Sequence, residues 1–185
     1  MKFYSLKLCG LKRQLPIVKI GPKLSIASFN LLGDTILAQK TAKALVRKIK
    51  DLDFDIMVGP EVKVLPLVYQ MAMLLGHKRY VIARKKIMGY MVNPVKLEAG
   101  RSLVLTGFAA QSLKGKKALI VDDVISTGRT IDTMKQLLLK VGCQPIAIAV
   151  ALKQGELKEK IDLPLIYLGK LPLISPSSRC IFNST

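Results

Sequence analysis

The stretch ALIVDDVISTGRT, residues 118–130, carries the clearest structural signal in the chain. Its apolar beginning is typical of a strand buried on both faces, and this run ends in two adjacent carboxylates, Asp122 and Asp123. A short loop of small residues follows. Apolar residues then recur at helical spacing up to Gly142, at Ile131, Met134, Leu137, Leu138 and Val141. The stretch therefore predicts a buried strand, a loop and the first turn of a helix.

The loop has the composition of an anion site. Backbone N–H groups at a helix N-terminus lack partners and bind phosphate. Hydroxyl groups add donors, and a glycine lets the backbone approach closely. Neither G-x-x-x-x-G-K-[ST] nor G-x-G-x-x-G occurs, so this is neither a P-loop nor a dinucleotide fingerprint. We expect the phosphate to lie on Ser126, Thr127, Gly128, Arg129 and Thr130.

Asp122 and Asp123 would repel a bare phosphate beside this loop. They fit a ligand that also carries neutral hydroxyls, or a bridging cation, close to its phosphate. A ribose 5-phosphate meets this requirement. The alternative is that the two carboxylates only end the strand and cap the turn that follows.

Strands and helices alternate through the rest of the chain. Apolar periodicity and flanking residues predict helices at 35–50, 64–76 and 129–142, with Asp34 in the N-cap region of the first. Strands are expected at 54–59, 79–83, 102–106, 116–123 and 145–152, after an N-terminal strand pair within 3–20. We expect 84–101 to be mostly a mobile loop and 171–185 an extended tail. Alternating strands and helices predict an α/β fold with a mostly parallel sheet, whose ligands bind at the carboxyl ends of the strands.

Composition limits the classes of function. The net charge is +18, from 30 Lys and Arg against 12 Asp and Glu, so the chain should attract anions such as phosphorylated metabolites, nucleic acid or acidic membranes. The lysines are dispersed, and no zinc-finger, RNA-recognition or basic-zipper signature appears. Three separated cysteines indicate neither a disulfide framework nor a zinc site. With no signal peptide and no uncharged run long enough for a bilayer, we expect a cytoplasmic protein.

The segment LIVDDVISTGRT resembles the signature of the type I phosphoribosyltransferases, in which two acids and a T-G-x-T loop bind phosphoribosyl pyrophosphate (PRPP). FDIMVGPEVKVLPL, residues 54–67, resembles the pyrophosphate-loop region of that family. RYVIARKKIMGYM, residues 79–91, resembles the Arg-Lys strand end that leads into the flexible catalytic loop. The resemblance covers about 35–173 and is nearest to the adenine phosphoribosyltransferase-like branch, including its divergent members.

This resemblance implies a single domain. Its central, mostly parallel twisted sheet would be flanked by helices over 35–173, with a small N-terminal β hood at 1–34 and a tail at 174–185. It also implies transfer of the phosphoribosyl group from PRPP, with Mg²⁺, to a purine base, giving a nucleoside monophosphate and pyrophosphate. A homodimer is expected.

The resemblance also assigns roles to residues. Asp122 and Asp123 would be catalytic and would hold the ribose hydroxyls, directly or through the metal. Glu98, in KLEAG, would be the carboxylate near the base. Pyrophosphate would bind at Glu61, Val62, Lys63, Arg84 and Lys85.

The chain departs from the adenine branch at two places. PEVKVLP, residues 60–66, stands where those enzymes commonly have an Ala-Arg-Gly loop, and Arg129 stands where glycine is common. Two hypotheses therefore remain open. One is an active purine-type transferase, and the other is a PRPP-binding regulator, or a nucleic-acid-binding protein, without transferase activity. The sequence does not name the base.

Overall fold

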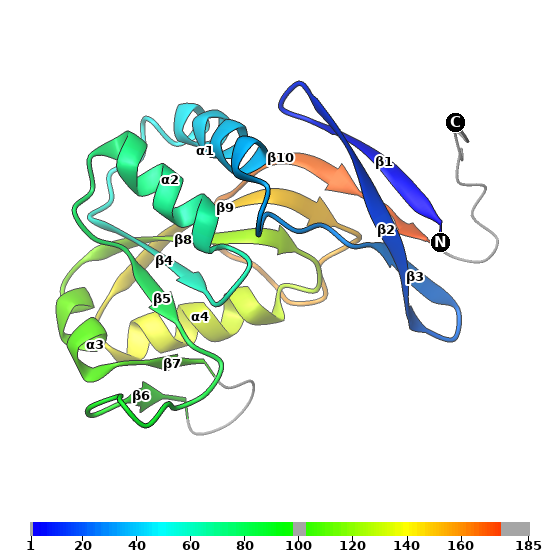
Figure 1. The fold of residues 1–185 in the computed structure, drawn as a ribbon. Helices are drawn as coiled ribbons and strands as arrows, with labels where there is room; N and C mark the ends of the chain where they lie inside the picture. The colour runs from blue at the N-terminus through cyan, green and yellow to red at the C-terminus, as the bar shows by residue number, and fades with distance from the viewer. Residues whose placement is uncertain (1, 98–102, 175–185) are drawn as a thin grey trace.

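A parallel sheet of five strands forms the centre of the computed structural model, which describes residues 2–97 and 103–174. The strand order is β10-β9-β8-β4-β5, and every neighbouring pair is parallel (Figure 1). The carboxyl ends of β8 and β4, which are neighbours, therefore meet at one edge. The strands are β4 (Ile56–Pro60), β5 (Val81–Ala83), β8 (Lys117–Ile125), β9 (Gln144–Gln154) and β10 (Leu165–Leu171).

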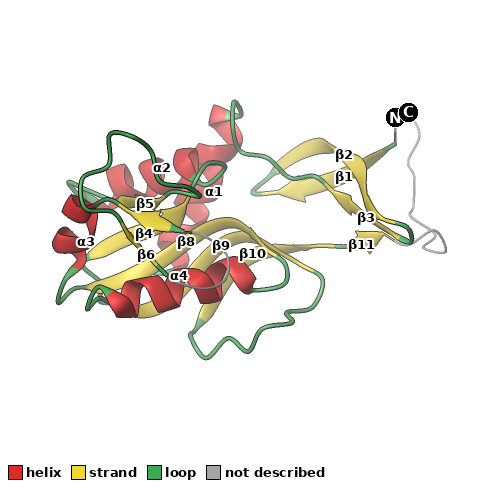
Figure 2. Cartoon of the chain, turned by 90° about the horizontal axis from the view of Figure 1, so that it is seen from below, coloured by secondary structure: helices red, strands yellow, loops and turns green. Residues whose placement is uncertain are grey.

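Helices cover both faces of this sheet (Figure 2). α1 (Thr35–Lys48) and α2 (Leu65–Leu75) bury their apolar faces in one hydrophobic core, and α4 (Arg129–Lys140) buries its apolar face in the other. α2 begins with Pro66 in its first turn and ends at Gly76, which has the left-handed conformation that favours glycine. None of the helices in the described residues is long and apolar enough to cross a bilayer.

A second, antiparallel sheet stands beside the core, in the order β1-β2-β3-β11 (Figure 1). β1 (Phe3–Leu8) and β2 (Leu11–Gly21) form the expected strand pair, which turns at Cys9 and Gly10. β3 (Leu24–Ala27) extends it, and β11 (Leu173–Ile174) joins from the other end of the chain. We call this four-stranded sheet the hood.

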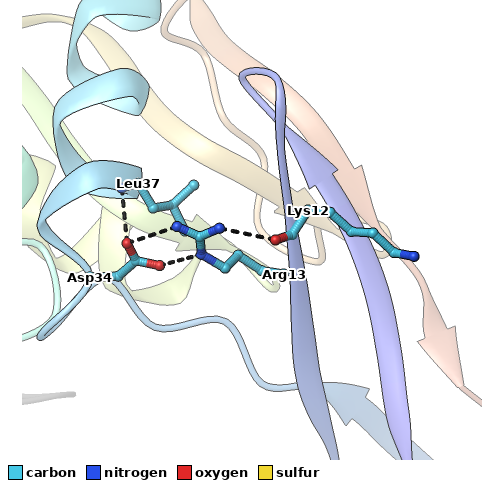
Figure 3. Close-up of polar contacts among 4 residues, drawn as sticks. All are labelled: Lys12, Arg13, Asp34 and Leu37. Carbon is cyan, nitrogen blue, oxygen red and sulfur yellow. Dashed lines mark hydrogen bonds and ion pairs between the residues drawn. The ribbon is translucent and has the colours of Figure 1, made fainter. Parts of the chain in front are cut away.

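An ion pair connects the hood to the core (Figure 3). Asp34 accepts a hydrogen bond from the Leu37 N–H at 3.0 Å and so caps α1, as its sequence position predicted. The same carboxylate pairs with Arg13 of β2 at 2.6 Å. The Arg13 guanidinium lowers the pKa of Asp34 below its ordinary value. The residue that caps the first helix of the core is therefore also bonded to a strand of the hood.

Several elements differ from expectation, among them β3, which lies after the predicted strand pair within 3–20. β10 was not predicted, because Gly169 and Lys170 interrupt its apolar run. α3 (Gly107–Leu113) was also missed, since seven residues are too few to show a helical period. Within the segment expected to be a loop, β6 (Val95–Lys96) pairs with β7 (Val104–Leu105), which is shorter than the strand predicted over 102–106.

Candidate active site

The two carboxylates of the opening stretch lie at the carboxyl end of β8. Asp122 and Asp123 are each only 8% exposed. Asp122 Oδ1 accepts the N–H of Asp123 at 2.8 Å, and Asp123 Oδ1 accepts the N–H of Val124 at 2.9 Å. Burial, followed by the neighbouring carboxylate, raises the pKa of Asp122 well above its ordinary value, and burial also raises the pKa of Asp123. Lys63 opposes both shifts. The pair is therefore a buried acidic site that a cation or a hydroxyl donor would stabilise.

The predicted anion loop leads directly into α4. Gly128 is the N-cap with φ +87°, a conformation that side chains disfavour, and it has no side chain to cap the helix; within the described residues the Arg129 N–H makes one long hydrogen bond, to Thr127 Oγ1 at 3.5 Å. The first-turn N–H groups of α4 therefore lack intrahelical acceptors. The segment that connects β9 to β10 contacts this loop. The N–H groups of its residues Lys158 and Glu159 both donate to the Thr127 carbonyl at 3.0 Å. Arg129 points to this segment and pairs with Glu159 at 3.4 Å.

The end of β4 faces this loop. Gly59 lets β4 lie close to β8, because a Cβ there would be 2.9 Å from the Val121 carbonyl oxygen. The peptide bond between Glu61 and Val62 is cis. Lys63 Nζ donates to the Phe29 carbonyl at 3.2 Å, which ties this turn to the segment that follows the hood strand β3.

Glu61 organises the neighbouring end of β5. Its N–H donates to the Ala83 carbonyl at 2.8 Å, and its carboxylate accepts the Lys85 N–H at 2.7 Å. The same carboxylate forms an ion pair with the Arg84 guanidinium. The side chain of Arg84 is thus paired with a protein carboxylate although it is 37% exposed, and Lys85 is exposed as well.

One cavity of about 610 Å³ brings these strand ends together. Of the residues predicted for the site, it is lined by Glu61, Val62, Lys63, Lys85, Asp122, Asp123 and Thr130. Arg84 and residues 126–129 are not part of its lining, and Glu98 lies outside the described residues. Thr133, one helical turn after the loop, also lines the cavity and was not anticipated. In the sequence, only its position three residues after Thr130, on the same side of the expected helix, could have indicated that it lines the site.

A smaller cavity of about 210 Å³ lies between the hood and the core. It shares Lys63, Asp123 and Val124 with the larger cavity. Residues 26–29 form its hood side, and Ser126 and Gln154 form its core side. Gln154 is 6% exposed, and within the described residues its side chain makes one long hydrogen bond, from Nε2 to the Pro172 carbonyl at 3.5 Å. Sequence reasoning missed Gln154 and Phe29, because neither belongs to a local motif.

Comparison with known proteins places this geometry in a family. A model of the phosphoribosyl transferase domain matches residues 32–168. An adenine phosphoribosyltransferase of Clostridium novyi is 30% identical over 82% of this chain and 92% of its own length. A hypoxanthine/guanine phosphoribosyltransferase of Methanothermococcus okinawensis is 33% identical over 78% and 80%.

The fold also has solved counterparts. The crystal structure of adenine phosphoribosyltransferase from Thermoanaerobacter pseudethanolicus superposes with a TM-score of 0.70, at 22% identity, over 84% of this chain and 95% of that one. The expected parallel sheet with flanking helices and an additional N-terminal sheet is confirmed. The chain therefore belongs to the phosphoribosyl transferase domain family and is a phosphoribosyltransferase, similar to the adenine phosphoribosyltransferases.

Proposed function

We propose that this enzyme transfers the 5-phosphoribosyl group of PRPP to a purine base, releasing pyrophosphate. The observation that carries the proposal is the pair of buried carboxylates, Asp122 and Asp123, in one cavity with Lys63 and Lys85 and with the first turn of α4. These groups match the parts of PRPP. The N–H donors suit its 5-phosphate, the acids suit its two ribose hydroxyls, and the cations suit its pyrophosphate.

The substrate would lie across the cavity. Its 5-phosphate would accept hydrogen bonds from the loop 126–130 and the first-turn N–H groups of α4. Its 2- and 3-hydroxyls would donate to Asp122 and Asp123. Its pyrophosphate would lie along 61–63 and Lys85, where Arg84 contributes indirectly by holding Glu61.

The lining charges favour a Mg²⁺ ion with this substrate. Glu61 is already paired with Arg84, so the carboxylates of Asp122 and Asp123 face the ammonium groups of Lys63 and Lys85 in equal number. A pyrophosphate would therefore enter a cavity without net positive charge. No cluster of three metal-ligating side chains occurs in residues 2–97 and 103–174, so these residues would need oxygens from the substrate or from water to complete the shell of a metal ion. Mg²⁺ typically uses one or two carboxylates and completes its shell with substrate oxygens and water. When bound, it would neutralise charge on the leaving pyrophosphate.

The residues of the chain would then act on the reacting sugar. Positive charge develops on the ribose ring as the bond to pyrophosphate breaks, and the buried carboxylates of Asp122 and Asp123 lie where they would stabilise it. Lys63 would favour their ionised forms, because its charge lowers both pKa values. We retain Glu98 as the proposed carboxylate near the base.

The acceptor base would occupy the smaller cavity between hood and core. Asp123 lines that cavity, so a base bound there would lie next to the ribose. Its apolar wall includes Ile26 and Phe29, and the Gln154 amide can both donate to and accept from the edge of a purine. The similarity to adenine and hypoxanthine/guanine enzymes supports a purine, although an orotate phosphoribosyltransferase of Halorhodospira halophila is also 33% identical over 62% of this chain.

We also propose a homodimer. Tyr69 and Met73 of α2 and Phe108 of α3 are 48%, 63% and 68% exposed and line one hollow together. Exposed apolar side chains that gather in this way typically mark a protein interface. Sedimentation equilibrium would test this, and a monomer at all concentrations would contradict it.

The decisive assay for the function is pyrophosphate release from PRPP and Mg²⁺ with each of adenine, hypoxanthine, guanine, xanthine, uracil and orotate. We expect one or two nucleoside monophosphates, with purines as the preferred acceptors. If PRPP binds and no base gives a product, the chain is the regulator that remained open in the sequence analysis.

A further inference from the structure

A third cavity, of about 560 Å³, lies where β9, β10 and β11 come together beside the hood. Lys153 of β9, Lys170 of β10 and Lys158 of the connecting segment line it. Leu157, Leu171 and Leu173 give it apolar walls. It shares no lining residue with the two cavities of the proposed active site.

The lysines of this cavity lie close enough to repel one another. Lys153 and Lys170 are direct partners in the parallel register of β9 and β10, so their side chains lie on the same face of the sheet. Like charges in such positions destabilise a sheet. Within the described residues, neither they nor Lys158 forms an ion pair with a carboxylate. The cavity contains one acidic side chain, Glu156, which leaves positive charge in excess. A bound polyanion would remove the repulsion.

We propose that this cavity binds a nucleoside phosphate, with its phosphates on Lys153, Lys158 and Lys170 and its base against the leucine walls. The volume lies in the range of pockets that hold molecules of that size and exceeds what inorganic phosphate fills. The combination of three cations and an apolar wall matches a ligand that has a charged end and an aromatic end.

The connecting segment joins this cavity to the phosphate loop. Lys158 lines the cavity with its side chain, and its backbone N–H donates to the Thr127 carbonyl. Glu159 makes the same contact and pairs with Arg129. A ligand that fixes Lys158 would therefore fix the loop on which the proposed function places the 5-phosphate of PRPP. We expect the ligand to lower the KM for PRPP, and this regulatory part of the inference rests on that proposed function.

Binding is tested first, with ATP as the probe and PRPP in excess without a base, so that the active site is filled. Calorimetry should show ATP binding to the wild type. Affinity should fall about tenfold or more in Lys153→Gln/Lys170→Gln, because two charge-assisted contacts are lost. The matched control Lys50→Gln/Lys114→Gln removes two exposed lysines that do not line this cavity and should bind ATP like the wild type. Equal affinity in both double variants, or no binding to the wild type, would overturn the site.

Two further measurements sharpen the test. Tripolyphosphate should bind more weakly than ATP, and equal affinity would refute the contribution of the apolar wall. Without ligand, Lys153→Gln should raise the melting temperature, because it removes the repulsion with Lys170; a decrease would contradict the argument from charge.

Regulation is tested by transferase kinetics. ATP should lower the KM for PRPP about fivefold in the wild type, within the usual range of coupling between sites, and should leave the lysine double variant unaffected. If ATP raises the KM equally in both proteins, it only competes at the active site, and the coupling is wrong. If the wild type shows no transfer with any base, the proposed function fails, whereas the binding experiment still decides whether the cavity is a site.

Discussion

The two halves of the candidate active site are built in different ways. One half, from Asp122 to Thr130, is a single run of sequence that ends β8 and begins α4. The other half joins the ends of β4 and β5, where Glu61 holds Arg84 and the Lys85 N–H. The first half concentrates two buried carboxylates, and the second supplies the cations, one of which is already neutralised by the protein.

This difference separates two kinds of chemistry. In the contiguous half, burial raises the pKa of both acids, so their negative charges are unfavourable there and a bound cation or hydroxyl donor would stabilise them further than Lys63 does. In the assembled half, Glu61 and Arg84 satisfy each other before any ligand arrives. We therefore expect changes in the contiguous half to affect activity strongly with little loss of stability, and changes in the other half to affect mainly PRPP binding.

The largest expected effect comes from Asp122→Asn and Asp123→Asn. If these carboxylates hold ribose and metal, activity should fall by roughly a hundredfold, or about 2.7 kcal/mol of transition-state stabilisation. The melting temperature without ligand should stay equal or rise, since the repulsion between the acids is removed. Asp132→Asn, in the first turn of α4, is the matched control. Variants that melt early but keep wild-type turnover would show that the acids only end the strand.

The double variant Asp122→Asn/Asp123→Asn should differ from the wild type in the pH dependence of its stability. Both pKa values are raised above 3.8, so the folded protein binds protons more readily than the unfolded chain. As pH rises through the window above 3.8, these two groups therefore make the wild type progressively less stable relative to the double variant. The depressed pKa values of Asp34 and Asp162 have the opposite effect, but they are common to both proteins and cancel in the difference. Parallel stability curves would show that the acids are not buried as charges.

In the assembled half, Lys63→Gln should raise the KM for PRPP about tenfold, or about 1.4 kcal/mol. Lys63 lines both cavities of the proposed site and favours ionisation of both acids. Lys43→Gln, at an exposed position of α1, should leave KM unchanged. Equal KM values for the two variants would remove Lys63 from the site.

The smallest expected effect concerns the base. Gln154→Leu keeps a similar volume but removes the amide from the smaller cavity. The ratio of kcat/KM for adenine and hypoxanthine should shift about fivefold, or about 1 kcal/mol, as expected for one hydrogen bond. The KM for PRPP serves as the internal control and should not move. An unchanged ratio would mean that Gln154 does not contact the base.

The sequence predicts the contiguous half of the site better than the assembled half, because only the contiguous half is encoded in one run of residues. Periodicity located α1, α2 and α4, and the run from Asp122 to Thr130 could be interpreted because its chemistry is local. Thr133, Phe29 and Gln154 reach the cavities only through tertiary packing, and no local pattern marks them. β11 enters the hood from the far end of the chain, a pairing that no short-range signal reveals. Nor does any spacing indicate that Arg84 pairs with Glu61.

A crystal structure with AMP tests the central claim most directly. We predict phosphate oxygens at about 2.7–3.2 Å from the N–H groups of the loop 126–130 and the first turn of α4, with the ribose hydroxyls on Asp122 and Asp123. AMP found only against Lys153, Lys158 and Lys170, with nothing bound at the end of β8, would contradict the assignment of the active site.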